Sequence, residues 1–524
     1  MQAVTQPSDA LAPAVLDGLA LEVEELEQQL LAMERALAPQ LAAVHADNLS
    51  SARNLVHYLA LRHYDIRDLQ MRLARVGLSS LGRSESHVLV TLQRIRAMLA
   101  LARGTSLAEA ADPPVGFRHG DDVLARNARR LLGPVHPQRD VRIVVTLPVE
   151  AATDPAVAAA LMDAGMDCAR INCARGDLAA WEGMAHNVRE AARTHGRECR
   201  ILVDLGGRKL RTGGVPGGGR RLRLNRGDTF DLVMPGASAM LTGGLRRIEC
   251  ASPELFDHAC AGQPIWFDDG RIGGVIEAAH AVGLRIRVTH AKASGSKLRP
   301  DRGINLPETD IALPALTPKD LTDLAGVVAF ADAIELSFAQ RESDVLDLHG
   351  ALDGLGAPDT GVVLKIETRA GFANLPQLLL AAMRRRRCGV MIARGDLAVE
   401  SGFERLAEVQ EEILWIAEAA HMPTIWATQV LDNLAKDGTL TRAEVTDAAM
   451  SGRAEAVMLN KGPFITDAIR TLDGILARMH THQSKKRALF RALQVSNSLW
   501  GDDADAADSA PVETSAGEQA QVRG

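Results

Sequence analysis

Apolar residues spaced alternately by three and four dominate the start of the chain. The series consists of Leu16, Leu19, Val23, Leu26, Leu30, Met33 and Leu37. It predicts an amphipathic helix that ends or bends at Pro39. Similar spacing over 47–77 and 84–102 predicts further helices, with a stop at Gly77. We expect these helices to pack within the chain, and a self-pairing coiled coil is the alternative.

The pattern changes after residue 140. Short β-branched, almost wholly apolar runs recur at 142–148, 168–174, 200–206, 333–338, 362–368, 389–397, 423–429 and 456–462. Segments of helical length separate them. Strands that are apolar on both faces are typical of parallel sheets covered by helices. Eight such units predict an α/β protein with a closed (β/α)8 TIM barrel.

One connection, after the third strand, is far too long for a crossover helix. Residues 214–299 instead show period-two alternation and an Asp-Gly hairpin signal. We therefore expect a small all-β domain inserted over the barrel mouth as a lid. The expected organisation is a helical N-terminal module (1–135), a barrel (140–213 and 300–483), the insert (214–299) and a polar, disordered tail (484–524).

Composition narrows the classes of function. The 524 residues carry a formal net charge of −7, which does not favour nucleic-acid or membrane-surface binding. The six cysteines lack zinc-site spacing, and reduced thiols are expected. The first residues lack the basic and apolar regions of a signal peptide, and no apolar run is long enough to span a bilayer. These observations predict a cytoplasmic protein.

Polar residues gather where the predicted barrel strands end. Candidates at these ends are Arg170, Asn172, Asp204, Lys209, Arg211, Lys365, Glu367, Asp396, Thr428, Asn460 and Lys461. Glu367 and Asp396 suit a hard divalent cation such as Mg²⁺. Lys365 lies two residues before Glu367, so both point to the same side of their strand. Arginine forks bind phosphate oxygens, and the set indicates chemistry on an anion.

Several of these stretches resemble the pyruvate kinase family. RINCARG (170–176) is similar to the family's RLNFSHG, DLGGRKLRTG (204–213) to DTKGPEIRTG, and PDRGINLP (300–307) to SKKGVNLP. KIET (365–368), MIARGDLAVE (391–400), IWATQVL (425–431) and TRAEVTDAA (441–449) follow in the family's order. The likeness covers about 140–480.

This resemblance implies a glycolytic phosphotransferase that converts phosphoenolpyruvate and ADP to pyruvate and ATP. In that reaction Arg170 would contact the phosphate and Lys365 would stabilise the phosphoryl group in flight. Backbone near Gly395, with Asp396, would bind the substrate carboxylate. Thr428 would lie near the enolate carbon that gains a proton.

The resemblance also implies cofactor and nucleotide contacts. Glu367 and Asp396 would hold Mg²⁺ (or Mn²⁺). Arg211 and Arg302 would contact the phosphates of ADP or ATP. A homo-oligomer, either dimer or tetramer, is expected, and the family's C-terminal regulatory domain is expected to be absent.

The chain departs from the family at its potassium site. Asn172 and Asp204 remain, but Ala174 and Leu205 stand where the family has Ser and Thr. Members that need no potassium typically carry Lys at the position of Lys209. We therefore expect Lys209 to supply the charge of the monovalent cation and K⁺ not to be required.

Two further departures leave other functions open. Arg175 replaces the family's His, and Asn460-Lys461-Gly462-Pro463 replaces its SGETA motif. One alternative is a phosphoenolpyruvate- or pyruvate-binding barrel with lyase-like chemistry. Another is a catalytically weak regulatory or scaffold homologue.

Overall fold

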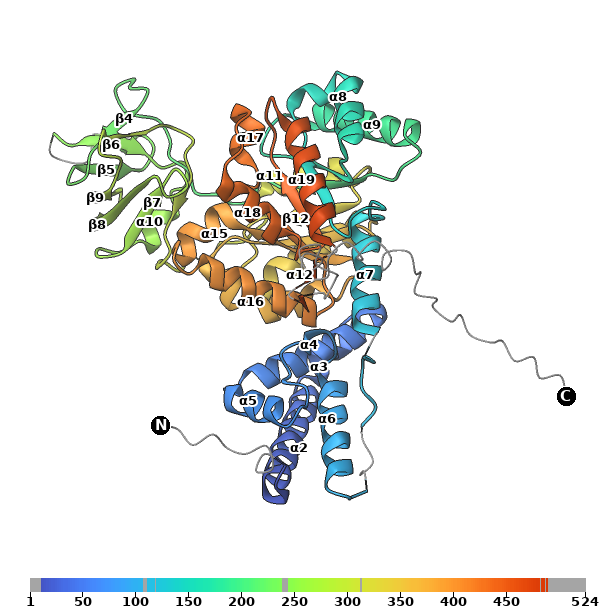
Figure 1. Ribbon diagram of the computed structural model, residues 1–524. Helices are drawn as coiled ribbons and strands as arrows, with labels where there is room; N and C mark the ends of the chain where they lie inside the picture. Colours follow the sequence, from blue (N-terminus) through green and yellow to red (C-terminus); the bar gives the residue numbers. More distant parts are fainter. Residues whose placement is uncertain are drawn as a thin grey trace, which may run out of the picture.

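A closed barrel of eight parallel strands forms the centre of the molecule (Figure 1). The structure is a computed structural model that describes residues 11–106, 111–117, 119–237, 244–311, 313–480, 482–485 and 487–488. The strands are β1 (Arg142–Thr146), β2 (Cys168–Asn172), β3 (Arg200–Asp204), β12 (Ala333–Leu336), β13 (Gly361–Ile366), β14 (Cys388–Ala393), β15 (Thr424–Ala427) and β16 (Ala456–Leu459). All eight strands expected from the sequence are confirmed, and β1 closes the barrel on β16.

Helices connect and cover these strands. They are α8 (Pro155–Ala164), α9 (Leu178–Thr194), α11 (Pro318–Val327), α12 (Glu342–Gly354), α13 (Arg369–Ala373), α14 (Leu375–Ala382), α15 (Arg394–Ser401), α16 (Leu406–Ala419), α17 (Asp432–Asp437), α18 (Arg442–Ser451) and α19 (Ile465–His480). Beyond α19, β17 (Gln483–Ser484) pairs with β18 (Arg487–Ala488). The tail expected from residue 484 lies outside the described residues from 489 onward.

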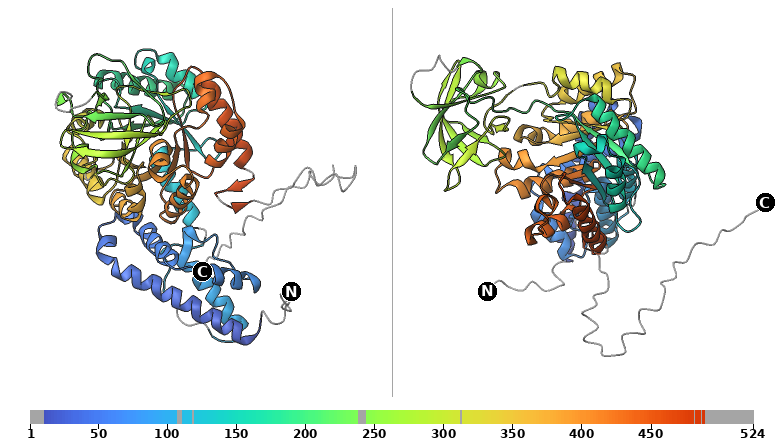
Figure 2. Two further views of the ribbon diagram at one scale, coloured as in Figure 1. Left: turned by 90° about the vertical axis from the view of Figure 1, so that its left-hand side faces the viewer. Right: turned by 90° about the horizontal axis from the view of Figure 1, so that it is seen from above.

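A separate β-structure follows β3, as the alternating pattern of 214–299 predicts. Its strands are β4 (Leu222–Leu224), β5 (Thr229–Val233), β6 (Arg246–Glu249), β7 (Pro264–Phe267), β8 (Ile272–His280), β9 (Gly283–His290), β10 (Ser296–Leu298) and β11 (Ile304–Asn305), with α10 (Leu255–His258) between β6 and β7. It has its own apolar core, which includes Phe230 and Phe267. Figures 1 and 2 show it standing apart from the barrel, on the side to which β3 leads.

Inward-facing positions divide the barrel into layers. The lower layer is apolar and contains Val144, Cys168, Leu202, Ala333, Val363, Met391, Ile425 and Ala456. Because side chains alternate along a strand, the next inward position lies two residues further toward the carboxyl end. On β13 this step leads from Val363 to Lys365. The polar positions found in the sequence are therefore those at the C-terminal mouth.

The N-terminal helices pack along one flank of the barrel, where α4 contacts α16 (Figure 1). They are α2 (Pro13–Ala36), α3 (Ala38–Ala42), α4 (Leu49–Arg62), α5 (Arg67–Arg75), α6 (Val88–Ala102) and α7 (His119–Leu132). As expected, α2 packs within the chain, against α4 and α6. Its buried residues belong to the same apolar cluster as the barrel's outer shell. The domain boundaries expected from the sequence stay predictions.

Helix α7 closes the floor of the barrel. Its Leu131 and Leu132 are buried among the lower-layer side chains. A Cβ atom at Gly361 would lie 2.6 Å from Leu131, and one at Gly389 would lie 2.5 Å from it. Gly361 is the first residue of β13 and Gly389 the second of the neighbouring β14, so the absence of their side chains makes room for the leucine.

Buried hydrogen bonds join the N-terminal helices to the barrel. His421 is fully buried, and its Nδ1 accepts from the Ser51 hydroxyl at 3.0 Å while Nε2 donates to the Ser86 carbonyl at 2.8 Å. The Asn54 amide donates to the carbonyls of Glu85 and Ala419. Burial lowers the pKa of His421 from 6.5 to about 4. The junction therefore holds this imidazole neutral.

We expect this junction to weaken in acid. Because the folded-state pKa is depressed, the stabilisation is complete above pH 6.5 and is lost as the pH falls toward 4. The free energy of unfolding of wild type relative to His421→Asn should fall by roughly 2–3 kcal/mol between pH 7 and pH 4, from 1.36 kcal/mol per pKa unit. Urea unfolding of both proteins at pH 7 and at pH 4 measures this change in the free energy of unfolding. Substitution of exposed His63 by Asn is the control, and equal pH slopes for wild type and His421→Asn would contradict the assignment.

Candidate active site

Four charged side chains form the inward layer above the apolar one: Arg170, Asp204, Glu335 and Lys365. The Lys365 ammonium donates to Asp204 Oδ1 at 2.9 Å and to the Ser337 hydroxyl at 2.7 Å. The Arg170 guanidinium donates to Asp204 Oδ2 at 2.5 Å and to Glu335 Oε2 at 2.7 Å. Strands β2, β3, β12 and β13 thus bring two cations and two carboxylates into one network.

Burial and charge act in opposite directions on these groups. Burial alone would lower the pKa of Lys365 and Arg170, but the facing carboxylates, Asp204 first, raise both. Burial alone would raise the pKa of Asp204, yet Arg170 and Lys365 hold it below its ordinary value. Burial does raise the pKa of Glu335. Both cations therefore stay charged inside the barrel.

Glu335 is a site residue that the sequence reasoning missed. It is completely buried, and its Oε1 has no hydrogen-bond partner among the described residues. The signal was present in AIELSF (333–338), where one acid interrupts an otherwise apolar strand. A buried acid in such a strand requires a cation partner, and Arg170 is that partner.

The two carboxylates expected to bind a metal lie at the rim of this network. Glu367 Oε1 is 3.1 Å from the Lys365 ammonium, and its Oε2 accepts from the Phe338 amide at 2.7 Å. Burial has the largest effect on the pKa of Glu367 and raises it. The positive charge of Lys365 lowers this pKa, and the negative charge of Asp396 raises it again, so the net shift is upward. The two acids are therefore close enough to repel each other, as a shared cation would require.

Lys209 and Asn305 hold Asp396 from the side of the insert. The Lys209 ammonium lies 2.9 Å from Asp396 Oδ2 and 3.7 Å from Asp269. Burial opposes this charge, but Asp396 and Asp269 outweigh it and raise the pKa of Lys209. The Asn305 amide, on the returning strand β11, donates to Asp396 at 3.3 Å and to Glu400 at 3.1 Å. Sequence reasoning missed Asn305, although INLP placed it in the hinge.

The residues of the expected monovalent-cation region are not joined to one another. Asn172 Oδ1 accepts from the Ala174 amide, and Asp204 is engaged by Arg170 and Lys365. Within the described ranges, no hydrogen bond or ion pair links Lys209 to Asn172 or Asp204. The ammonium of Lys209 lies at the metal-site carboxylate instead.

The remaining candidates line the hinge and the opposite rim. Arg211 lies 3.3 Å from Asp301, and Arg302 lies 3.2 Å from Asp268. Both side chains are more than a third exposed, so they face the solvent.

Thr428 combines a strained backbone with an unpaired hydroxyl. Its φ is 69°, and the φ of Gln429, which follows it, is 61°. Its buried Oγ1 has no partner in the part of the chain that the structure describes. A Cβ atom at Gly395, in the first turn of α15, would lie 3.7 Å from that oxygen. Arg394 donates to the Thr428 carbonyl and keeps the strained turn in place. Such strain is typical of functional sites.

The mouth can offer a metal two protein carboxylates at most. Among the described residues, no group of three or more His, Cys, Asp or Glu side chains is placed to hold a metal ion. Two carboxylates with open positions fit Mg²⁺, which takes its other ligands from water and substrate oxygens. Within the same residues, no helix is long and apolar enough to cross a membrane.

The fold and this mouth define a (β/α)8-barrel protein with a buried cluster of charged side chains at the carboxyl ends of its strands. Residues 138–463 match the family model described as the pyruvate kinase barrel domain. The chain therefore belongs to the pyruvate kinase family.

Named relatives agree. A pyruvate kinase of Geobacillus stearothermophilus is 33% identical over 349 residues, covering 65% of this chain and 57% of the relative. One from Mycobacterium tuberculosis is 31% identical, covering 66% and 71%. A pyruvate kinase structure from Cryptosporidium parvum shares the fold, with a TM-score of 0.58, 24% identity, and coverage of 67% and 72%. The chain spans less than three fifths of the length of the Geobacillus relative.

We expect the Glu335–Arg170 pair to be essential for stability. Glu335→Leu should cost about 3 kcal/mol or more, because it leaves Arg170 with one carboxylate in the core. Glu335→Gln should cost less, because its carbonyl can still accept from Arg170. Urea unfolding measures both, with exposed Glu182→Gln as control, expected within about 0.5 kcal/mol of wild type. A leucine variant as stable as wild type would contradict this prediction.

Proposed function

We propose that the chain catalyses phosphoryl transfer between phosphoenolpyruvate and ADP, giving pyruvate and ATP. The buried Arg170–Asp204–Lys365 network at the barrel mouth carries this proposal. Among the described residues, three of the five guanidinium hydrogens of Arg170 are used in hydrogen bonds. The others remain for a substrate phosphate. Lys365 supplies a fixed positive charge for the phosphoryl group as it moves.

The charges of the mouth explain why a divalent cation is needed. Three cations, Arg170, Lys365 and Lys209, face four carboxylates, Asp204, Glu335, Glu367 and Asp396. With these acids ionised, such a site repels a polyanionic substrate. Mg²⁺ held by Glu367 and Asp396 would reverse the local charge and polarise substrate oxygens.

The rim residues complete the substrate site. Backbone N–H groups at the start of α15, near Gly395, suit the substrate carboxylate. The Thr428 hydroxyl, which has no partner among the described residues, lies near Gly395 and would serve proton transfer to the enolate carbon. The exposed Arg211 and Arg302 would bind the nucleotide phosphates.

Lys365→Met should abolish this activity. Loss of the fixed charge is expected to lower kcat by about 10²–10³-fold or more, measured as pyruvate formed from phosphoenolpyruvate, ADP and Mg²⁺. The exposed Lys436→Met variant is the control and should keep wild-type kcat. Product NMR without ADP separates lyase-like chemistry from transfer. Pyruvate formation that persists undiminished in Lys365→Met would overturn the proposal.

We further propose that the reaction does not require K⁺. Ala174 and Leu205 offer no side-chain oxygen to a monovalent cation. The charged Lys209 ammonium, already 2.9 Å from Asp396, supplies a permanent positive charge at the metal site. This places the compensating charge beside the divalent cation instead of at Asn172 and Asp204.

Substitution of Lys209 should therefore lower kcat, whereas removal of K⁺ should leave kcat unchanged. Wild type should keep its kcat in a Tris buffer without K⁺ or Na⁺, whereas Lys209→Gln should lose at least about tenfold, equivalent to 1.4 kcal/mol. Lys297→Gln, an exposed lysine of the insert, is the matched control. A wild-type enzyme that is inactive until K⁺ is added would refute this part while leaving the phosphotransferase proposal intact.

A further inference from the structure

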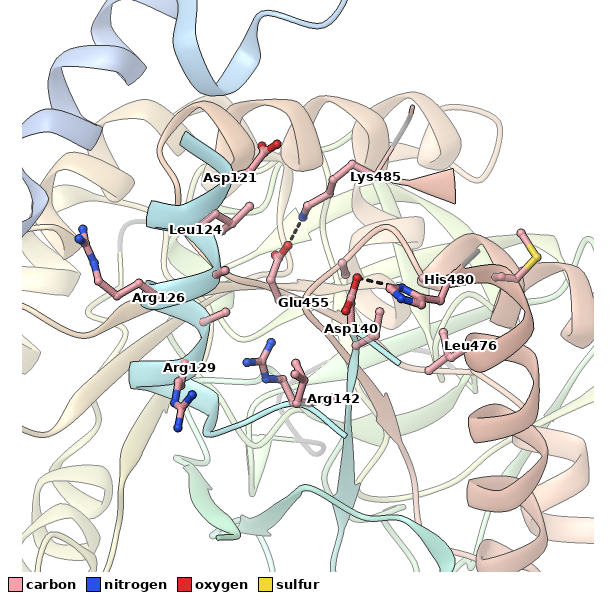
Figure 3. A pocket seen from close by; sticks show the side chains of 17 residues that line it. Asp121, Leu124, Arg126, Arg129, Asp140, Arg142, Glu455, Leu476, His480 and Lys485 are labelled. Atoms are coloured by element: carbon pink, nitrogen blue, oxygen red, sulfur yellow. Dashed lines mark hydrogen bonds and ion pairs between the residues drawn. The ribbon is translucent and has the colours of Figure 1, made fainter. Parts of the chain in front are cut away.

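A second cavity lies at the floor of the barrel, at the opposite end from the mouth. Its volume is about 570 Å³, within the usual range for small-molecule sites. It opens between α7, the start of β1 and the end of α19 (Figure 3). The apolar part of its wall comprises Leu124, Ala125, Ala128, Val135, Val141, Ala454, Leu476 and Met479.

Arg142 is the charged group at the centre of this cavity. Only 4% of the residue is exposed. Its Nε and Nη2 both donate to the Gly133 carbonyl, at 3.1 and 2.9 Å. No carboxylate of the described residues forms an ion pair with it. Burial lowers the pKa of Arg142, because the charged form is poorly solvated.

Arg139, three residues earlier, shows how the fold satisfies a buried guanidinium. It is 1% exposed and pairs with Asp167 at 2.6 Å and with Asp473 at 2.7 Å. A buried charge without such partners costs several kcal/mol. Among the described residues, Arg142 has no carboxylate within ion-pair distance, and the charges of Glu455, Asp167 and Asp140 act on it only from a greater distance.

The acids that also line the cavity are already engaged. Asp140 lies 2.9 Å from His480, Glu455 pairs with Lys485, and Asp121 accepts from the Ser86 hydroxyl at 3.4 Å. Figure 3 shows the first two pairs and Arg142 between α7 and α19. These carboxylates make the surroundings unfavourable for a dianion such as phosphate, but less so for a single negative charge.

We propose that this cavity binds a small monocarboxylate with an apolar body. The carboxylate would pair with Arg142 through its unused guanidinium hydrogens, and the apolar part would cover Leu124, Ala128 and Leu476. Such a charge-assisted contact would remove the cost of leaving the guanidinium unpaired. The site is distinct from the mouth and does not rest on the proposed phosphotransfer.

Hexanoate is a suitable probe, because it joins a carboxylate to a short apolar chain. Isothermal titration calorimetry with the full chain should show binding by hexanoate. Hexanamide, which lacks the charge, and acetate, which lacks the apolar body, should each bind at least about tenfold more weakly. This series on the unsubstituted protein decides the question even if a variant fails to fold. Equal affinity for hexanoate and hexanamide, or no binding of hexanoate, would overturn the proposal.

Variants then locate the site. Arg142→Met should weaken hexanoate binding at least about tenfold. Arg126→Met is the matched control, because Arg126 lies on the same cavity's helix but points away from Arg142 in Figure 3. It should change the dissociation constant by less than twofold, and circular dichroism verifies the fold of both. Unchanged binding in a folded Arg142→Met, or equal weakening by Arg126→Met, would place the probe elsewhere.

Discussion

Ion pairing inside a low-dielectric barrel is the interaction on which the mouth depends. Arg170 and Lys365 remain charged only because Asp204 and Glu335 face them from neighbouring strands. Charges brought together in this way are strongly coupled, since little water screens them. The same network fixes the guanidinium of Arg170 and the ammonium of Lys365 in place.

The two ends of the barrel interior differ in polarity. The lower inward layer is apolar and is closed by Leu131 of α7, whereas the next layer is charged. An apolar floor keeps water from the charged layer above it and strengthens its ion pairs. Of the N-terminal helices, α7 forms this floor, and α4 joins the barrel through buried contacts such as that of Ser51 with His421. These helices are thus part of the barrel's support.

Particular residues show how far sequence reasoning reaches. Period-two alternation and the length of apolar runs located all eight strands and the insert, because those patterns reflect burial within one segment. Lys365 and Glu367 could be paired in advance, since they are two residues apart on one strand. Glu335 was missed because its role depends on a contact with Arg170, which lies 165 residues away in the sequence. The contact of Lys209 with Asp396 was likewise beyond reach, as it joins the hinge of the insert to a different strand.

The sequence by itself determined the barrel, the insert and the residue types at the strand ends, because local periodicity and motif order carry that information. Only the tertiary structure decided which charges meet. It gave Arg170 two carboxylates and Arg139 two, and it gave Arg142 no ion pair among the described residues. Arg139 and Arg142, three residues apart, look alike in the sequence. Their surroundings differ because electrostatic partners come from strands and helices that are distant along the chain and adjacent only once the barrel has closed.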